Sequence, residues 1–201
     1  DSDSIVDKNA LENALRAFSD PRVQAITGTC LVLNRDKNLL TRLTDLEVVT
    51  GNYLQRGARS VLGAVAPTSG PFAVYRSEVI FDNEEDYLTS GTYSDDRRLT
   101  HYALMRGQVV ASDDVIVEMN MPETIKGMFK QRVRWYQGYF KYLPWEMRYF
   151  TGWPLLLRMY NLLIVSILPI LLLWGFIVVP ITLGVFFWQA CIYWILILQT
   201  M

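Results

Sequence analysis

Two adjacent acids stand in front of two arginines in the segment TYSDDRRLTHYALMRG, residues 92–107. If Asp96 begins a helix, the helix N-terminus lowers the pKa of its carboxyl group and the neighbouring Asp95 raises it. A carboxylate in this balance could take a proton from a hydroxyl group as a general base. The competing interpretation is a helix N-cap followed by basic surface residues, and without further context the N-cap is favoured.

A second pair of acids occupies the first residues, which read DSDS. On an extended segment, Asp1 and Asp3 point to one side and Ser2 to the other. Two such carboxylates can bind a divalent cation through oxygen ligands, and the cation could neutralise a diphosphate leaving group. On its own, the D-x-D pattern is more typical of a solvated turn.

A third candidate lies in the basic segment KQRVRWYQGYF. Gln131, Arg134 and Trp135 stand at positions i, i+3 and i+4, so they share one face of a helix. A guanidinium there can bind a phosphate through two hydrogen bonds, and the indole offers a flat surface for a sugar ring. The alternative is a basic interfacial helix with aromatic anchors, which explains the composition but not this triplet.

A fourth candidate is the turn Ser69-Gly70-Pro71. It places tight backbone beside a strand and leaves room for a sugar to approach, although alone it indicates only a turn.

Periodicity and turn residues predict the elements that must position these groups. Helices are expected over residues 7–18, 38–62, 96–106 and 124–141. Extended segments are expected over 23–35 (one bent strand or two short ones), 62–76 (strand, turn, strand) and 108–120, and an acidic loop over 81–93. This alternation indicates an α/β layer.

The C-terminal part of the chain is strongly apolar. Residues 159–201 contain no Asp, Glu, Lys or Arg, which predicts two membrane spans, roughly 159–179 and 182–200. The preceding residues 126–158 hold seven basic residues and one acid, Glu146, and favour a membrane-surface helix with the soluble part in the cytoplasm. The alternative is a core helical hairpin of a large soluble protein.

Other features narrow the function classes. The net charge of −1 gives no overall field for a nucleic acid. Cys30 and Cys191 have no metal-site spacing, and the only histidine, His101, is interpreted as structural. The chain opens without an initiator Met, so we expect a piece of a longer protein.

The order of these motifs resembles that of membrane-embedded, processive family-2 glycosyltransferases. SGPFAVYR, DDRRLT and QRVRW are most similar to hyaluronan synthases and to nodulation-type chitin-oligosaccharide synthases. Cellulose synthases usually show T-E-D at the position of Ser94-Asp95-Asp96. The resemblance covers nearly the whole chain.

The resemblance implies a role for each motif. Asp96 would be the catalytic base for the acceptor hydroxyl. Asp1 and Asp3 would bind Mg²⁺ or Mn²⁺ and the nucleotide diphosphate, with Asp3 preferred as the direct metal ligand. The UDP-sugar donor and the acceptor end would be bound by Gln131, Arg134 and Trp135. The acceptor pocket would be lined by Ser69, Gly70 and Pro71 and supported by Asp95 and Arg97.

The implied architecture is the C-terminal part of a GT-A type α/β catalytic domain over residues 1–121, interface helices over 122–158 and transmembrane helices over 159–201. The implied enzyme is a multi-pass plasma-membrane protein with a cytoplasmic catalytic domain. It would polymerise UDP-GlcNAc and UDP-GlcA onto a growing polysaccharide, hyaluronan, and extrude it across the lipid bilayer.

Two differences from the family pattern leave the identity of the polymer undecided. Relatives of the hyaluronan type usually have Gly at the position of Ser94 and a second Gln at that of Arg132. The alternatives are a synthase of chitin oligosaccharide, a cellulose-like glucan or a lipid-linked sugar, and a membrane-anchored scaffold with a decayed transferase domain.

Overall fold

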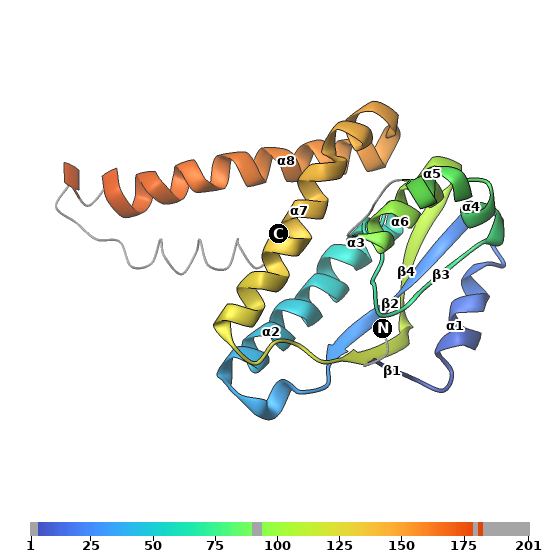
Figure 1. Ribbon diagram of the computed structural model, residues 1–201, viewed down its shortest axis with the longest axis horizontal. Coiled ribbons are helices and arrows are strands. Elements are labelled where there is room, and N and C mark those ends of the chain that lie inside the picture. The colour runs from blue at the N-terminus through green and yellow to red at the C-terminus, as the bar shows by residue number, and fades with distance from the viewer. Residues whose placement is uncertain (1–3, 90–93, 179–180, 183–201) are drawn as a thin grey trace.

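A mixed four-stranded sheet forms the centre of the molecule in the computed structural model, which describes residues 4–89, 94–178 and 181–182 (Figure 1). The strand order is β1-β4-β2-β3. β2 and β4 run parallel, whereas β1 pairs with β4 and β3 pairs with β2 in antiparallel fashion. The strands are β1 (Ile5–Val6), β2 (Val23–Val32), β3 (Ala73–Tyr75) and β4 (Gln108–Met119).

Helices form most of the connections between the strands and also make up the part of the chain that follows β4. The α-helices are α1 (Ala10–Ala17), α2 (Leu39–Thr50), α3 (Gly57–Val61), α4 (Ser77–Phe81), α5 (Glu84–Thr89), α6 (Asp95–Arg106), α7 (Ile125–Tyr149) and α8 (Gly152–Leu173). The shorter 3-10 or π segments are η1 (Arg35–Lys37), η2 (Gly51–Arg56) and η3 (Trp174–Val178).

The two faces of the sheet are covered by different helices. Consecutive residues of β2 point to opposite faces, so Ala25 and Ile26 belong to different apolar clusters. Ala25 packs with Tyr102 of α6, and Ile26 packs with Ala10 of α1. The resulting three layers confirm the predicted α/β class.

Most predicted helices are present. The helix expected over 38–62 is α2, η2 and α3 in direct succession, and it starts with a capping box in which the Asn38 side chain accepts from the Thr41 N–H at 3.0 Å. The helix expected over 96–106 begins one residue earlier, at Asp95.

Three predictions were wrong in part. The acidic loop over 81–93 contains helix α5, because acids in a first helical turn are stabilised by the helix dipole. The helix over 124–141 continues to Tyr149 and passes through Pro144. The first strand expected within 62–76 is reduced to a single bridge between Ala64 and Val109.

The predicted extended segment over 23–35 forms one strand, β2, with a register shift against β4 between Gly28 and Thr29. A Cβ atom on Gly28 would lie 2.6 Å from the Val115 carbonyl oxygen, so only glycine fits this close approach.

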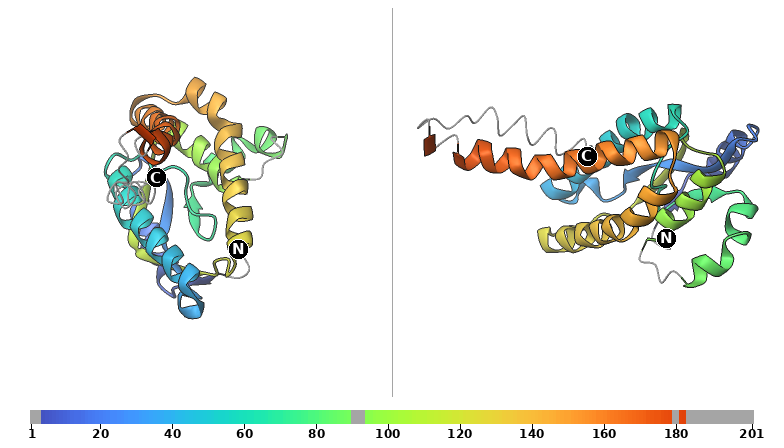
Figure 2. Two further views of the ribbon diagram at one scale, coloured as in Figure 1. Left: turned by 90° about the vertical axis from the view of Figure 1, so that its left-hand side faces the viewer. Right: turned by 90° about the horizontal axis from the view of Figure 1, so that it is seen from above.

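One described helix, Gly152–Val178, is long and apolar enough to cross a membrane, with a mean hydropathy of 2.5. Its most apolar window is unburied, and Figures 1 and 2 show α8 extending away from the sheet. The second predicted span, 182–200, lies outside the described residues except for its first residue. The domain limits at 121 and 158 stay predictions.

Candidate active site

The structure brings two of the predicted motifs together. A Cβ atom on Gly70, in the turn at 69–71, would lie 3.9 Å from Oδ2 of Asp96 in the first turn of α6. The chain closes a loop of more than twenty residues to make this approach. Glycine leaves the space directly beside the carboxylate free of a side chain.

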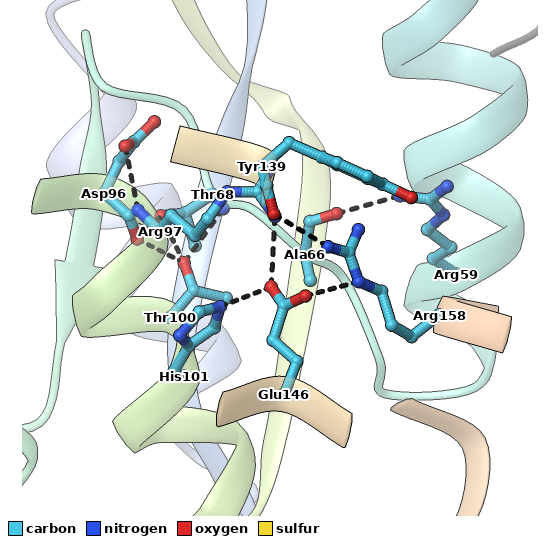
Figure 3. A network of polar contacts seen from close by, with 10 residues as sticks. All are labelled: Arg59, Ala66, Thr68, Asp96, Arg97, Thr100, His101, Tyr139, Glu146 and Arg158. Carbon is cyan, nitrogen blue, oxygen red and sulfur yellow. Dashed lines mark hydrogen bonds and ion pairs between the residues drawn. The ribbon is translucent and has the colours of Figure 1, made fainter. Parts of the chain in front are cut away.

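Buried hydroxyl groups hold the turn against α6. The Thr68 N–H donates to Oγ1 of Thr100 at 3.0 Å, and the two threonine hydroxyls lie 2.9 Å apart. The Thr100 hydroxyl donates to the Asp96 carbonyl oxygen at 2.6 Å (Figure 3). On the other side of the turn, the Ser69 N–H donates to Oγ1 of Thr27 in β2 at 2.7 Å. The turn and Asp96 are therefore fixed to the sheet and to each other.

Tyr75 of β3 completes this hydroxyl cluster. Its OH group lies 2.6 Å from Oγ1 of Thr68 and 3.5 Å from the Asp96 carbonyl oxygen. Burial raises the pKa of Tyr75 to about 12, so the phenol stays protonated at working pH.

The Asp96 carboxyl group is partly buried, and burial is the main cause that raises its pKa. The Arg97 N–H donates to its Oδ1 at 2.8 Å, and the charges of Arg97 and Arg56 also oppose the rise. The neighbouring Asp95 adds to the rise, but it is the weakest of these influences. Ser94 occupies the N-cap position, so the competing assignment of Asp96 as the cap is wrong.

The Arg97 side chain points away from Asp96 towards α7. Its Nη1 donates to Oε1 of Glu146 at 3.1 Å, and the same oxygen lies 2.7 Å from Nε2 of His101 (Figure 3). Glu146 also forms an ion pair with Arg158 of α8. Burial favours the neutral acid, but His101, Arg97 and Arg158 outweigh it and lower the pKa of Glu146.

Sequence reasoning missed the role of Glu146 as a partner of the site. The available signal was that it is the single acid among the basic residues of 126–158. His101 is completely buried inside this cluster, in agreement with its interpretation as structural.

The triplet on α7 is held less firmly. Arg134 is exposed, Trp135 is 43% exposed, and the Nε2 group of Gln131 lies 3.8 Å from the sulfur atom of Met121. The guanidinium that stacks on Trp135, at 4.3 Å, belongs to Arg132, which also pairs with Glu47 of α2 at 2.6 Å. No direct contact between the triplet and Asp96 is present among the described residues.

Helix α7 nevertheless passes close to the N-terminal end of α6. A Cβ atom on Gly138, one turn after the triplet, would lie 2.2 Å from the Ser94 hydroxyl oxygen. This approach places the helix that carries the triplet beside the residue that precedes Asp95 and Asp96.

The predicted metal ligands Asp1 and Asp3 lie outside the described residues. Within residues 4–89, 94–178 and 181–182, no group of three or more His, Cys, Asp or Glu side chains could hold a metal ion. The bound metal therefore stays a prediction.

Comparisons with known proteins agree with the motifs. A family model described as glycosyl transferase family group 2 matches residues 1–201. The chain is 38% identical over 147 residues to a hyaluronan synthase of Streptococcus pyogenes serotype M1 and 32% identical over 148 residues to an N-acetylglucosaminyltransferase of Rhizobium meliloti (strain 1021). Both alignments cover 70% of this chain, which spans about a third (35%) of the length of these curated relatives. Because the family model covers the whole chain, this protein belongs to glycosyl transferase family group 2.

Proposed function

We propose that the chain is the part of a processive, inverting glycosyltransferase that carries the catalytic base and the acceptor turn. The observation that supports this best is the approach of Gly70 to the Asp96 carboxylate. A sugar hydroxyl that entered over Gly70 would meet a carboxylate whose pKa is raised by burial. Such a carboxylate is a stronger base than an ordinary surface aspartate.

Inversion by direct displacement needs one base and a stabilised leaving group. Asp96 would take the proton of the acceptor hydroxyl as that oxygen attacks the anomeric carbon and UDP leaves. Arg134 would bind the diphosphate, Gln131 and Trp135 would bind the donor and the acceptor end, and Asp95 and Arg97 would support the acceptor side. Ser69, Gly70 and Pro71 would shape the acceptor pocket in a GT-A type domain.

A divalent ion, Mg²⁺ or Mn²⁺, would be held by Asp1 and Asp3 and would neutralise the charge of the diphosphate.

We infer that the donors are UDP-sugars and that the product is hyaluronan, made from UDP-GlcNAc and UDP-GlcA. The similarity to the streptococcal hyaluronan synthase supports this product. The similarity to the rhizobial N-acetylglucosaminyltransferase supports the second candidate, a chitin oligosaccharide made from UDP-GlcNAc alone.

The proposed location is the plasma membrane, with the catalytic part in the cytoplasm and the product extruded through a multi-pass membrane region. The apolar helix Gly152–Val178 and the basic α7 before it support this placement.

The test uses the full-length enzyme in membranes and follows UDP release and polymer with each donor alone and with both. Polymer only with both donors supports hyaluronan, and polymer with UDP-GlcNAc alone supports the second candidate. An absence of both UDP release and polymer would favour a non-catalytic scaffold.

The base is tested by Asp96→Asn, which should lower polymer synthesis by about 1000-fold while leaving UDP-sugar binding measurable. Asp36→Asn is the matched control, because Asp36 is an exposed acid with surface arginine partners. Normal polymer yield from Asp96→Asn would refute the base assignment.

A further inference from the structure

A buried carboxylate lies where three helices meet. Glu146 of α7 is 1% exposed and contacts three basic side chains (Figure 3). Arg97 and His101 reach it from α6, at 3.1 and 2.7 Å, and Arg158 reaches it from α8. The proposed function assigns no role to Glu146.

The arrangement links the three helices through one side chain. A buried carboxylate is stable only when it is paired, so displacement of any one helix would leave charges buried without partners. Arg158 adds a second link, because its Nη2 donates to the Tyr139 carbonyl oxygen at 2.9 Å and its guanidinium lies 3.6 Å from the Tyr139 ring centroid. The start of α8 is therefore fixed to two turns of α7.

The same carboxylate determines where Arg97 points. The backbone N–H of Arg97 donates to the Asp96 carboxylate, whereas its guanidinium pairs with Glu146. Without Glu146, the Arg97 guanidinium would lose this carboxylate partner, and its positive charge near Asp96 would be less compensated.

We propose that Glu146 is a positioning residue that couples the membrane-side helix α8 to the catalytic base, by holding the guanidinium of Arg97 away from the Asp96 carboxylate. The inference rests on the proposed function, since it assumes that Asp96 is the base. Position changes of α8 would then alter the reactivity of Asp96 through Arg158, Glu146 and Arg97.

The charged groups around Asp96 determine how the pH–rate profile should change when Glu146 is replaced. Asp96 interacts with Arg97, Arg56 and Asp95, and Tyr75 lies against its carbonyl oxygen. Loss of the negative charge of Glu146 leaves the positive charge of Arg97 less compensated. The pKa of Asp96 therefore falls, and the acid limb of the pH–rate profile moves to lower pH.

The test compares Glu146→Gln with wild type in the full-length enzyme. We expect kcat to fall at least tenfold with little change in the KM for the donor, together with the shift of the acid limb. A residue that merely stabilised the fold would lower the amount of active enzyme without moving the pH limb. Glu12→Gln is the matched control, because Glu12 is an exposed acid of α1 that pairs with the exposed Arg16.

Arg158→Met is the second variant and keeps the test decisive if Glu146→Gln does not fold. Arg158 contacts Glu146 and Tyr139, so we expect its loss to lower kcat. Without Arg158 the Glu146 carboxylate compensates the charge of Arg97 more fully, so the acid limb should move to higher pH, opposite to the shift in Glu146→Gln. In the double variant the losses should not add, because both act through one carboxylate. Wild-type kcat and pH limb in both single variants, or additive losses in the double variant, would overturn the proposal.

Failure of the proposed function would look different. In that case wild type itself would transfer no sugar, and the coupling would be judged from thermal unfolding of wild type, Glu146→Gln, Arg158→Met and the double variant. Additive shifts in Tm would then show that Glu146 does not join α8 to α6.

Discussion

The two sides of the candidate site are held in different ways. On the proposed acceptor side, the turn at 69–71 and the proposed base Asp96 are joined by hydrogen bonds among buried hydroxyl groups. On the proposed donor side, Arg134 and Trp135 project from α7 with exposed side chains. The comparison indicates that the proposed base is preorganised, whereas the proposed phosphate-binding side chains are free to adjust to a ligand.

The first prediction asks whether the exposed side chains on α7 contribute to activity without contributing to stability. Arg134→Ala should reduce kcat/KM for the donor by about 100-fold, the size typical of removing one charge-stabilising donor, without changing thermal stability. Measurement of kcat/KM and Tm on the same preparation checks this. Arg148→Ala is the control, since Arg148 is a basic residue at the far end of α7. A fall in Tm equal to that of a core substitution would show that the donor side is also structural.

The second prediction concerns the contact between the two sides. Gly138→Ala would place a Cβ atom 2.2 Å from the Ser94 hydroxyl oxygen, so the Ser94 side chain or α7 must shift. We expect the free energy of unfolding to fall by about 2 kcal/mol, as for other overpacked positions, and activity to fall with it.

The control for Gly138→Ala is the double variant with Ser94→Gly, which removes the conflicting side chain. Recovery of Tm in the double variant would confirm the contact. Equal instability of the single and double variants would contradict it.

The third prediction has the smallest expected effect and concerns pH. Burial lowers the pKa of His101 below its ordinary value of 6.5, although the hydrogen bond to Glu146 opposes this. The unfolded chain therefore binds more protons at this position, and stability should fall as the pH drops below about 6.5. The lowered pKa of Glu146 acts in the same direction at more acidic pH, below its ordinary value of 4.5.

A series of Tm measurements between pH 7.5 and pH 5.5 tests this, with His101→Gln as the comparison. The slope of Tm against pH should be shallower in His101→Gln than in wild type. An equal slope would show that His101 does not titrate differently in the folded and unfolded chain.

Local sequence signals predicted the elements but not all of their limits. Asn38 and the apolar periodicity after it placed the start of the long helix correctly, because capping is a local interaction. The acids Glu84, Glu85 and Asp86 were interpreted as a loop, although they form the first turn of α5. There Asp86 bonds to Arg98 and Tyr102 of α6, a tertiary contact that composition alone does not reveal.

The candidate site was predictable only in its parts. Residue types suggested Asp96 as a base and Gly70 as part of a turn, but their approach depends on the paths of β3 and α6. Burial, rather than the neighbouring Asp95, is the main cause of the raised pKa of Asp96, and burial is a property of the folded chain. The link through Glu146 joins residues of three helices and has no local pattern.

The ion pair of Arg158 has a consequence for the depth of the protein in a bilayer. Arg158 is the seventh residue of the helix Gly152–Val178, so at 1.5 Å per residue it lies about 9 Å along the axis from the first residue. A helix with one anchored guanidinium near its start cannot sink further into hydrocarbon without breaking that pair. If α8 spans the membrane, the pair fixes how far Asp96 and the turn at 69–71 stand from the lipid headgroups.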